Sequence, residues 1–97
     1  MAVYESVEVY GSGKPFSAIE RVGPDATVLR SWMEDGTLIF EFGLTDKREK
    51  HGRYRSWWND GVLKEEGSFQ HGKRVGMYRW YLPSGALWKE HDYGGVP

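Results

Sequence analysis

The stretch that decides the fold is residues 52–76, which read GRYRSWWNDGVLKEEGSFQHGKRVG. An Asp-Gly dipeptide at positions 60–61 divides this stretch into two runs that carry aromatic and aliphatic residues between polar ones. Asp-Gly between two such runs is a strong short-range signal of a β-hairpin, because glycine takes the positive φ of a tight turn without steric cost. No apolar residues recur at helical spacing over three turns. We therefore predict a β-hairpin here.

The same pattern recurs along the chain. Dipeptides that end in glycine stand at Gly13, Gly36, Gly61 and Gly85, which are 23, 25 and 24 residues apart. Around the last three, five columns of similar residues keep the same distance from the glycine. These columns are Arg30, Arg55 and Arg79; Trp32, Trp57 and Tyr81; Leu38, Leu63 and Leu87; Glu41, Glu66 and Glu90; and Leu44, Phe69 and Tyr93. A repeat of this kind predicts stacked copies of one hairpin. The first copy lacks the Arg, Leu and Glu and is expected to be a terminal cap.

The chain has 97 residues, which is the length of a single domain. We predict an all-β fold, an antiparallel meander of about four stacked β-hairpins with eight short strands, in one domain spanning residues 1–97. The copies are expected at 4–26, as a degenerate cap, and at 27–51, 52–75 and 76–95. The link at 45–52 is one residue longer than its counterpart, so this loop is expected to bulge.

The register of each hairpin follows if the dipeptide forms a two-residue type I′ turn. Opposite residues then carry opposite charges in three hairpins: Arg30 faces Glu41, Arg55 faces Glu66, and Arg79 faces Glu90. On the same face, nearer the turn, Trp32 is expected to face Ile39, Trp57 to face Lys64, and Tyr81 to face Trp88. A shift of one residue would exchange the two faces, so the register determines which side chains form the core.

The face without the Arg-Glu pairs is predicted to be the main core. Its residues are Leu29, Met33, Leu38 and Phe40 in one hairpin, Tyr54, Trp58, Leu63 and Phe69 in the next, and Tyr78, Trp80, Leu82, Leu87 and Tyr93 in the last. The Arg-Glu face has two interpretations. Its ion pairs set the strand register of an exposed sheet, at well under about 1 kcal/mol each, or they border a partner-binding surface, since Arg and aromatic residues dominate binding hot spots. In the second interpretation the binding residues are Arg30, Trp32, Arg55, Trp57, Arg79, Tyr81 and Trp88.

Composition narrows the function. Five Trp, six Tyr and four Phe accompany 13 Gly, and the lack of Cys excludes disulfides, Cys-based metal sites and a thiol nucleophile. The formal net charge of −1 argues against nucleic-acid binding. The basic excess of the second half centres on residues 47–55, which we interpret as a solvated loop and strand, with a phosphate site as the alternative. No apolar run has the length of a signal peptide or membrane helix, so a soluble cytoplasmic protein is expected.

We predict no catalytic, metal or cofactor site. His51, His71 and His91 are 20 residues apart, whereas the repeat has a period of about 24, so they are expected at non-equivalent places. The repeated glutamates each face an arginine, which keeps them ionised and unsuited to general-acid catalysis. The glycine-lysine turn at residues 11–14 lacks the spacing of a P-loop. A single-layer sheet also offers no deep pocket, so we do not expect an enzyme.

The unit from Gly52 to Gly76 is Gly-x-Tyr-x-x-Trp-x-x-Asp-Gly-x-Leu-x-x-Glu-x-x-Phe-x-x-Gly-Lys-x-x-Gly, and a further copy begins at Gly76. It resembles the bacterial variant of the MORN repeat, and the resemblance covers roughly residues 27–95. Such repeats occur in small bacterial proteins of the YwqK-type antitoxin family. The resemblance implies an elongated antiparallel sheet of stacked hairpins that acts by binding another protein. The chain has fewer copies than most family members, which suggests a compact or homodimeric version.

We therefore expect a non-enzymatic protein-binding module of bacterial or phage type, an antitoxin or immunity-type inhibitor that covers a toxin or another effector protein. One alternative is an aromatic repeat that binds choline or a glycan, similar to choline-binding repeats, in which aromatic cages hold a quaternary ammonium. The longer period, the Arg and Glu columns and the lack of a secretion signal favour the first hypothesis. The other alternative is membrane-lipid binding, as proposed for eukaryotic MORN proteins, but only residues 47–55 offer the cationic face it requires.

Overall fold

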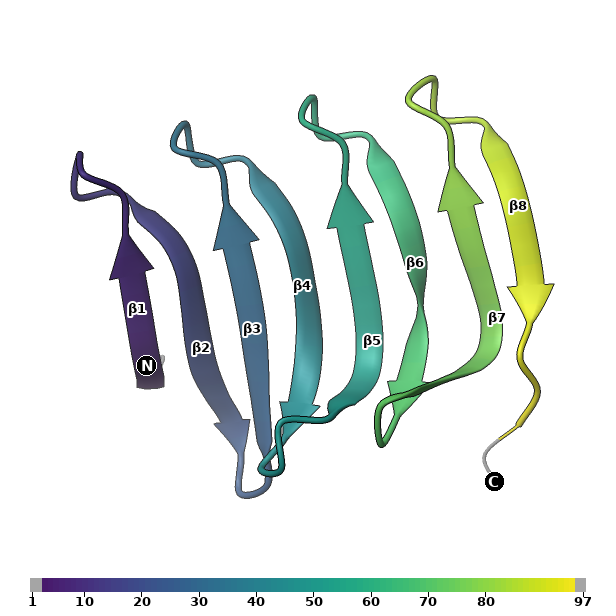
Figure 1. Ribbon diagram of the computed structural model, residues 1–97, viewed down its shortest axis with the longest axis horizontal. Helices are drawn as coiled ribbons and strands as arrows, with labels where there is room; N and C mark the ends of the chain where they lie inside the picture. The colour runs from purple at the N-terminus through teal and green to yellow at the C-terminus, as the bar shows by residue number, and fades with distance from the viewer. Residues whose placement is uncertain (1–2, 96–97) are drawn as a thin grey trace.

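The computed structural model describes residues 3–95 and shows one open antiparallel sheet whose eight strands follow the chain order (Figure 1). The strands are β1 (Val3–Val9), β2 (Pro15–Gly23), β3 (Ala26–Trp32), β4 (Leu38–Thr45), β5 (Lys50–Trp57), β6 (Leu63–Gln70), β7 (Lys73–Tyr81) and β8 (Leu87–Asp92). The described residues form no helix, and so none that could cross a membrane. The predicted all-β antiparallel meander of hairpins is confirmed.

The four turns that contain Gly13, Gly36, Gly61 and Gly85 have three residues each rather than the two that we predict. At the second turn, the Met33 N–H donates to the Thr37 carbonyl at 2.8 Å, and the Gly36 N–H donates to the Met33 carbonyl at 2.9 Å. Within this turn only Gly36 has a positive φ, at 95°. The geometry is a type I turn followed by a left-handed glycine, so the predicted type I′ turn is wrong. The same two hydrogen bonds and a left-handed glycine recur at Gly13, Gly61 and Gly85.

A β-bulge follows each turn. Trp32 pairs with Leu38, and Ser31 pairs with Phe40. Ile39 is therefore an extra residue on β4. The extra residues in the other hairpins are Phe16, Lys64 and Trp88, each three residues after the turn glycine. The three-residue turn shifts the register by one residue, and the bulge restores it. Residues beyond the bulge are paired as predicted, whereas those between the bulge and the turn are not.

The repeat columns divide accordingly. The predicted register is confirmed for Arg30 with Glu41, Arg55 with Glu66, and Arg79 with Glu90. The partners predicted for the aromatic column, Ile39, Lys64 and Trp88, are wrong. The structure instead places Trp32 opposite Leu38, Trp57 opposite Leu63, and Tyr81 opposite Leu87. These leucines therefore lie on the face with the arginines and not on the predicted core face.

The links at the other edge of the sheet differ from one another. His71 and Gly72 join β6 to β7, and both have positive φ, at 48° and 85°. The type I′ turn that we predict at the other edge therefore occurs here. β4 and β5 are joined by a three-residue turn that ends in Arg48, with a φ of 65°. This confirms the longer loop predicted within residues 45–52.

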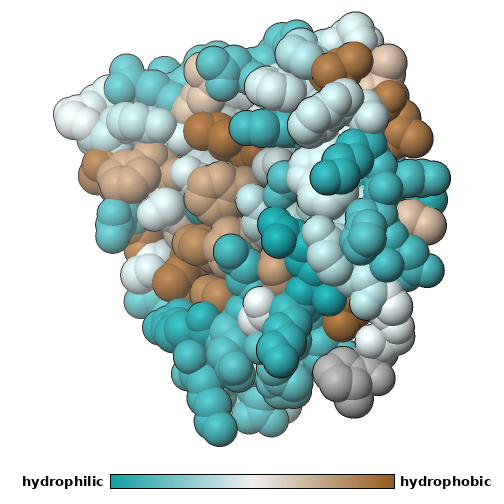
Figure 2. Space-filling view, turned by 45° about the vertical axis from the view of Figure 1, so that its right-hand side comes forward, coloured by the Kyte–Doolittle hydropathy of each residue, from teal (hydrophilic) through white to brown (hydrophobic). Residues whose placement is uncertain are grey.

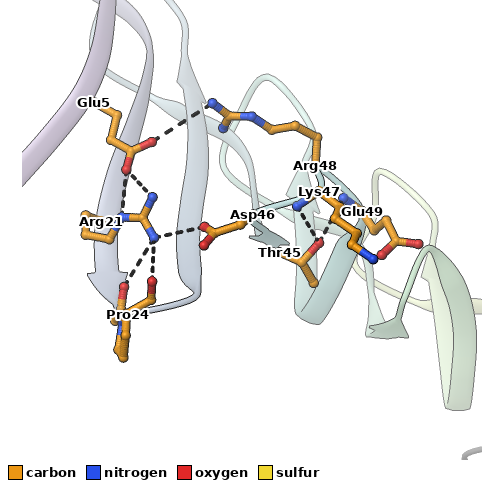
Figure 3. A network of polar contacts seen from close by, with 9 residues as sticks. Glu5, Arg21, Pro24, Thr45, Asp46, Lys47, Arg48 and Glu49 are labelled. Atoms are coloured by element: carbon orange, nitrogen blue, oxygen red, sulfur yellow. Dashed lines mark hydrogen bonds and ion pairs between the residues drawn. The ribbon is translucent and has the colours of Figure 1, made fainter.

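Ion pairs hold this longer link against the N-terminal hairpin (Figure 3). Arg21 on β2 pairs with Asp46 in the link at 2.9 Å and with Glu5 on β1. Its guanidinium also donates to the Pro24 carbonyl at 3.1 Å, and Arg48 lies 4.0 Å from Glu5. Hydrogen bonds to Glu5 and Asp46 raise the pKa of Arg21. Each of these exposed ion pairs contributes little stability by itself. Because Arg21 takes part in two of them, it connects β1, β2 and the link.

The sheet is thin, with extents of 40 × 36 × 20 Å. Among residues 3–95, four hydrophobic residues are buried: Ala18, Leu44, Phe69 and Tyr78. The last two lie on the predicted core face, where Tyr78 is 0 % exposed. Its ring covers Gly67 so closely that a Cβ at this glycine would lie 2.0 Å from a ring atom. Three residues expected in the core are exposed instead: Leu82, Leu87 and Tyr93.

Candidate functional site

One face of the sheet carries alternating charges from β2 to β8, and we call it the ladder face. The alternating row consists of Glu20, Arg30, Glu41, Arg55, Glu66, Arg79 and Glu90, and Arg53 lies on the same face beside Arg55. Arg30 lies between two carboxylates, 2.7 Å from Glu20 and 3.1 Å from Glu41. Glu41 also accepts a hydrogen bond from Arg55. The hydrogen bonds to Glu20 and Glu41 raise the pKa of Arg30, so its guanidinium stays charged.

The row is interrupted between β5 and β6. Arg55 and Glu66 lie opposite each other, but within residues 3–95 the ion pair of Arg55 is with Glu41 on β4. Beyond the break, Arg79 lies 3.2 Å from Glu90 and 3.8 Å from Glu66. The Arg55 Nε is buried and has no hydrogen-bond partner among the described residues. The predicted Arg55–Glu66 pair is therefore correct in register but is not an ion pair.

The aromatic column of the ladder face lies beside this row, on the side of the turns. Trp32, Trp57 and Tyr81 are half-buried, and each is paired with a leucine of the next strand. The guanidinium of Arg55 lies 5.6 Å from the Trp57 ring centre. The Tyr81 hydroxyl donates to Glu66 at 3.1 Å, and burial together with this bond raises the pKa of Tyr81. We call these three aromatic residues the aromatic strip.

Trp88 is separate from the aromatic strip. It is the bulged residue of the edge strand β8, does not lie opposite Tyr81, and is 65 % exposed. The structure therefore places six of the seven predicted binding residues on one face: Arg30, Trp32, Arg55, Trp57, Arg79 and Tyr81.

Two open hollows flank Arg53 and Arg55. The first has a volume of about 310 Å³, and its lining includes Val28 and Gly43. The second has a volume of about 240 Å³, and its lining includes Gly67. The hollows can accept side chains of a docked protein beside the arginines, but they do not enclose a small molecule.

The opposite side of the sheet, which we call the aromatic face, carries a continuous run of rings. Ring centres lie 5.4 Å apart for Phe42 and Tyr54, and 5.6 Å apart for Tyr54 and Phe69. They lie 5.9 Å apart for Phe69 and Tyr78, and 4.8 Å apart for Tyr78 and Trp80. Such distances are typical of favourable ring contacts. The aromatic face is therefore the more tightly packed side of the sheet.

Four basic side chains lie over rings of the aromatic face, and the sequence pattern does not indicate them as a group. They are Lys50, Lys64, Arg74 and Lys89. The charge pattern points only to residues 47–55, because the four cations are irregularly spaced in the chain. The bulges and links decide which residues face this side, and these are not visible in the sequence. One usable signal is that Lys64 and Lys89 follow a turn glycine by three and four residues.

Two of the three histidines come together. The His51 and His71 ring centres lie 5.1 Å apart, and the His71 N–H donates to His51 Nδ1 at 3.3 Å. His71 also lies 3.5 Å from Glu49. His91 lies elsewhere, 4.5 Å from the Tyr93 ring centre. Within residues 3–95, no three or more His, Asp or Glu side chains gather in a way that could hold a metal ion.

No protein-family model matches the chain, and none of the curated proteins does. Two solved structures of TarM are similar in fold. One is the S. aureus TarM G117R mutant in complex with fondaparinux, alpha-GlcNAc-glycerol and UDP, with a TM-score of 0.55, 15% identity and 96% of this chain covered. The other is a TarM structure with a TM-score of 0.53, 16% identity and 94% covered. The match spans 19% of the TarM chain in both cases. At this identity the likeness shows the fold alone.

Proposed function

We propose that the protein is a non-enzymatic protein-binding module whose binding site is the ladder face. The supporting observation is the aromatic strip, Trp32, Trp57 and Tyr81, beside arginines that ion pairs hold in place. Trp, Tyr and Arg are the residues that most often dominate binding energy. Side chains that are ordered before binding lose less conformational entropy when a partner docks.

We further propose that the partner is a toxin or another effector protein and that the chain acts on it as an antitoxin or immunity-type inhibitor in the cytoplasm. The resemblance of residues 52–76 to the bacterial MORN variant supports this class of partner. The open surface also suits a protein better than a small molecule. Homodimerisation is part of the proposal, because β1 and β8 are exposed along their whole length and unpaired sheet edges favour pairing with another chain.

A quaternary-ammonium site has less support. Rings gather on the aromatic face, but the chain's own cations already lie over them. Lys50 Nζ is 5.3 Å from the Phe42 ring centre, and the guanidinium carbon of Arg74 is 4.9 Å from that of Tyr78. A cationic ligand would have to displace a cationic side chain to reach the ring. We therefore do not extend the proposal to choline.

The test compares two neighbouring tryptophans on opposite faces of β5 and its turn. The tagged chain is purified from its native host, and each bound protein is then reconstituted with the pure chain. Trp57→Ala should weaken partner binding at least about ten-fold. Trp58→Ala should change it less than about two-fold, because this residue lies outside the ladder face. Equal losses in the two variants, or no protein that rebinds the pure chain, would contradict the proposal.

A second readout tests the inhibitor class. Cells that produce the reconstituted partner alone should stop growing, and co-production of the wild-type chain should restore growth. The Trp57→Ala variant should restore it less well than Trp58→Ala at equal protein levels. A partner that leaves growth unaffected would show that the chain binds a protein but is not an antitoxin.

A further inference from the structure

We propose that the aromatic face is a second binding surface, which takes an acidic, partly apolar segment of another protein. This goes beyond the function proposed above, which uses the ladder face. Three features of the aromatic face support it: its cations have no carboxylate partners, an apolar region adjoins them, and its rings are already covered.

The cations of the aromatic face are held in place by the rings. Lys50 lies 5.3, 5.9 and 5.4 Å from the ring centres of Phe42, Tyr54 and Phe69. Arg74 is 5.5, 4.9 and 5.9 Å from those of Phe69, Tyr78 and Tyr93. Lys64 lies 4.8 Å from Trp58, and Lys89 lies 5.4 Å from Trp80. These distances are measured from the charged heads, so the heads themselves lie over the rings, and Lys64, Arg74 and Lys89 are still exposed to solvent.

These four cations lack ion-pair partners, in contrast to Arg30, Arg55 and Arg79 on the other side of the sheet. Within residues 3–95, no carboxylate lies within 4.0 Å of Lys50, Lys64, Arg74 or Lys89. The register places one carboxylate on the same face, Glu65 opposite Trp80, where it accepts a hydrogen bond from the Tyr78 hydroxyl at 2.9 Å and is outnumbered by the four cations. The β5–β8 half of the aromatic face therefore presents unbalanced positive charge, which is complementary to an acidic partner.

An apolar region adjoins the cations on the same face. The register places Leu29 opposite Phe42, and Ile19 opposite Leu29. Phe40 lies in the neighbouring row, and all four side chains are only half-buried. The space-filling view shows a hydrophobic patch bordered by hydrophilic side chains (Figure 2). A partner segment that alternates acidic and apolar side chains would satisfy both halves of this face.

Two other classes of polyanion fit less well. A nucleic-acid base needs an open ring to stack on, but Tyr78 is fully buried and Phe69 is 8 % exposed. A membrane needs protruding apolar side chains, and the most exposed large apolar residue, Trp88, is on the edge strand β8. A protein segment requires neither feature, because it can place carboxylates on the cation heads and apolar side chains on the half-buried patch.

The test titrates the full chain with a synthetic amphipathic peptide of glutamate, alanine and leucine, and in parallel with polyuridylate and with phosphatidylserine vesicles. The peptide should bind with an affinity that falls as salt rises. The Lys64→Glu/Lys89→Glu variant should weaken peptide binding at least about ten-fold, since two attractive contacts become repulsive. Lys14→Glu/Lys47→Glu has the same net charge and should lose less than about two-fold, because both lysines lie in turns.

Two further variants keep the outcome decisive. Lys64→Gln/Lys89→Gln removes the charges without reversing them. With an unchanged circular-dichroism spectrum of the sheet, this variant should also bind the peptide more weakly than the wild-type chain. Trp57→Ala should leave peptide binding unaltered, which separates this inference from the ladder-face proposal. The inference is overturned if the peptide does not bind, if the two double-glutamate variants lose affinity equally, or if only polyuridylate or the vesicles bind.

Discussion

The two faces of the sheet accommodate charge in different ways. On the ladder face, Arg30, Arg55 and Arg79 each meet a carboxylate, whereas within residues 3–95 the cations of the aromatic face lie over rings. Burial differs as well, since Tyr78 on the aromatic face is fully buried and the aromatic strip of the ladder face is only half-buried. Packing therefore stabilises one face and charge pairing the other. Substitutions on the two faces should differ in size and in their dependence on pH and salt.

The largest effect is expected where the aromatic face is packed most closely. Gly67→Ala would place a Cβ 2.0 Å from the Tyr78 ring, which cannot move away because it is surrounded by other rings. Overpacking of this kind should lower the free energy of unfolding by about 3 kcal/mol. Urea denaturation followed by tryptophan fluorescence measures the change.

Gly11→Ala is the matched control for this substitution. A Cβ at Gly11 has nothing within 4 Å, and this glycine does not have a positive φ. Its free energy of unfolding should change by less than about 0.5 kcal/mol. If both variants proved equally stable, the close packing of Tyr78 on Gly67 would be wrong.

The ladder face should respond less strongly, even at its most connected residue. Glu41→Gln keeps the shape of the side chain but removes the charge that Arg30 and Arg55 share. Because the side chain is 17% exposed, a loss of about 2 kcal/mol is expected from two weakened charge-assisted hydrogen bonds. Glu90→Gln, which has one arginine partner and 47% exposure, should cost less than half as much. A larger loss of unfolding free energy for Glu90→Gln than for Glu41→Gln would show that Glu41 is not the most strongly connected carboxylate of the ladder face.

Much of this comparison follows from the sequence, because the repeat carries it. The glycine spacing predicts the hairpins, and the Arg and Glu columns fall beyond the bulges, where the register of a two-residue turn happens to hold. Arg30 and Glu41 are therefore placed correctly although the turn between them has another geometry. The same pattern separates the face of Phe69 and Tyr78 from the face of the arginines.

The remaining errors come from backbone geometry that no residue type reports. A left-handed glycine fits both a two-residue and a three-residue turn, and only the hydrogen bonds distinguish them. The bulge that follows transfers Leu38 to the other face and leaves Trp88 unpaired. Lys64 on the aromatic face was missed for the same reason, since it occupies a bulge. Local backbone irregularities thus decide which side chains reach the surface where binding is expected.

Alkaline pH should destabilise the aromatic face first. Burial, reinforced by the hydrogen bond to Glu65, raises the pKa of Tyr78 well above its ordinary value of 10.0. A phenol whose pKa is raised on folding supports the fold fully below pH 10 and loses this contribution as pH rises, because the unfolded tyrosine ionises first. At pH 11 the loss should be about 1.4 kcal/mol. Urea denaturation between pH 9 and pH 11 measures it, and Tyr78→Phe should remove this part of the pH dependence. An unchanged slope in that variant would assign the effect to other tyrosines.

The smallest expected effect is a difference between the two faces in how their charged residues respond to salt. Arg79 and Glu90 are 41% and 47% exposed, so their pair should contribute less than about 1 kcal/mol and should be screened by salt. Raising sodium chloride from low to high concentration should therefore reduce the coupling energy of Arg79→Gln and Glu90→Gln in a double-mutant cycle. The change in the free energy of unfolding caused by Lys89→Gln on the aromatic face should not depend on salt. Within residues 3–95 this lysine has a ring and no carboxylate beside it. A salt-sensitive loss at Lys89 would mean that a carboxylate balances its charge, and the contrast between a paired face and an unbalanced face would then disappear.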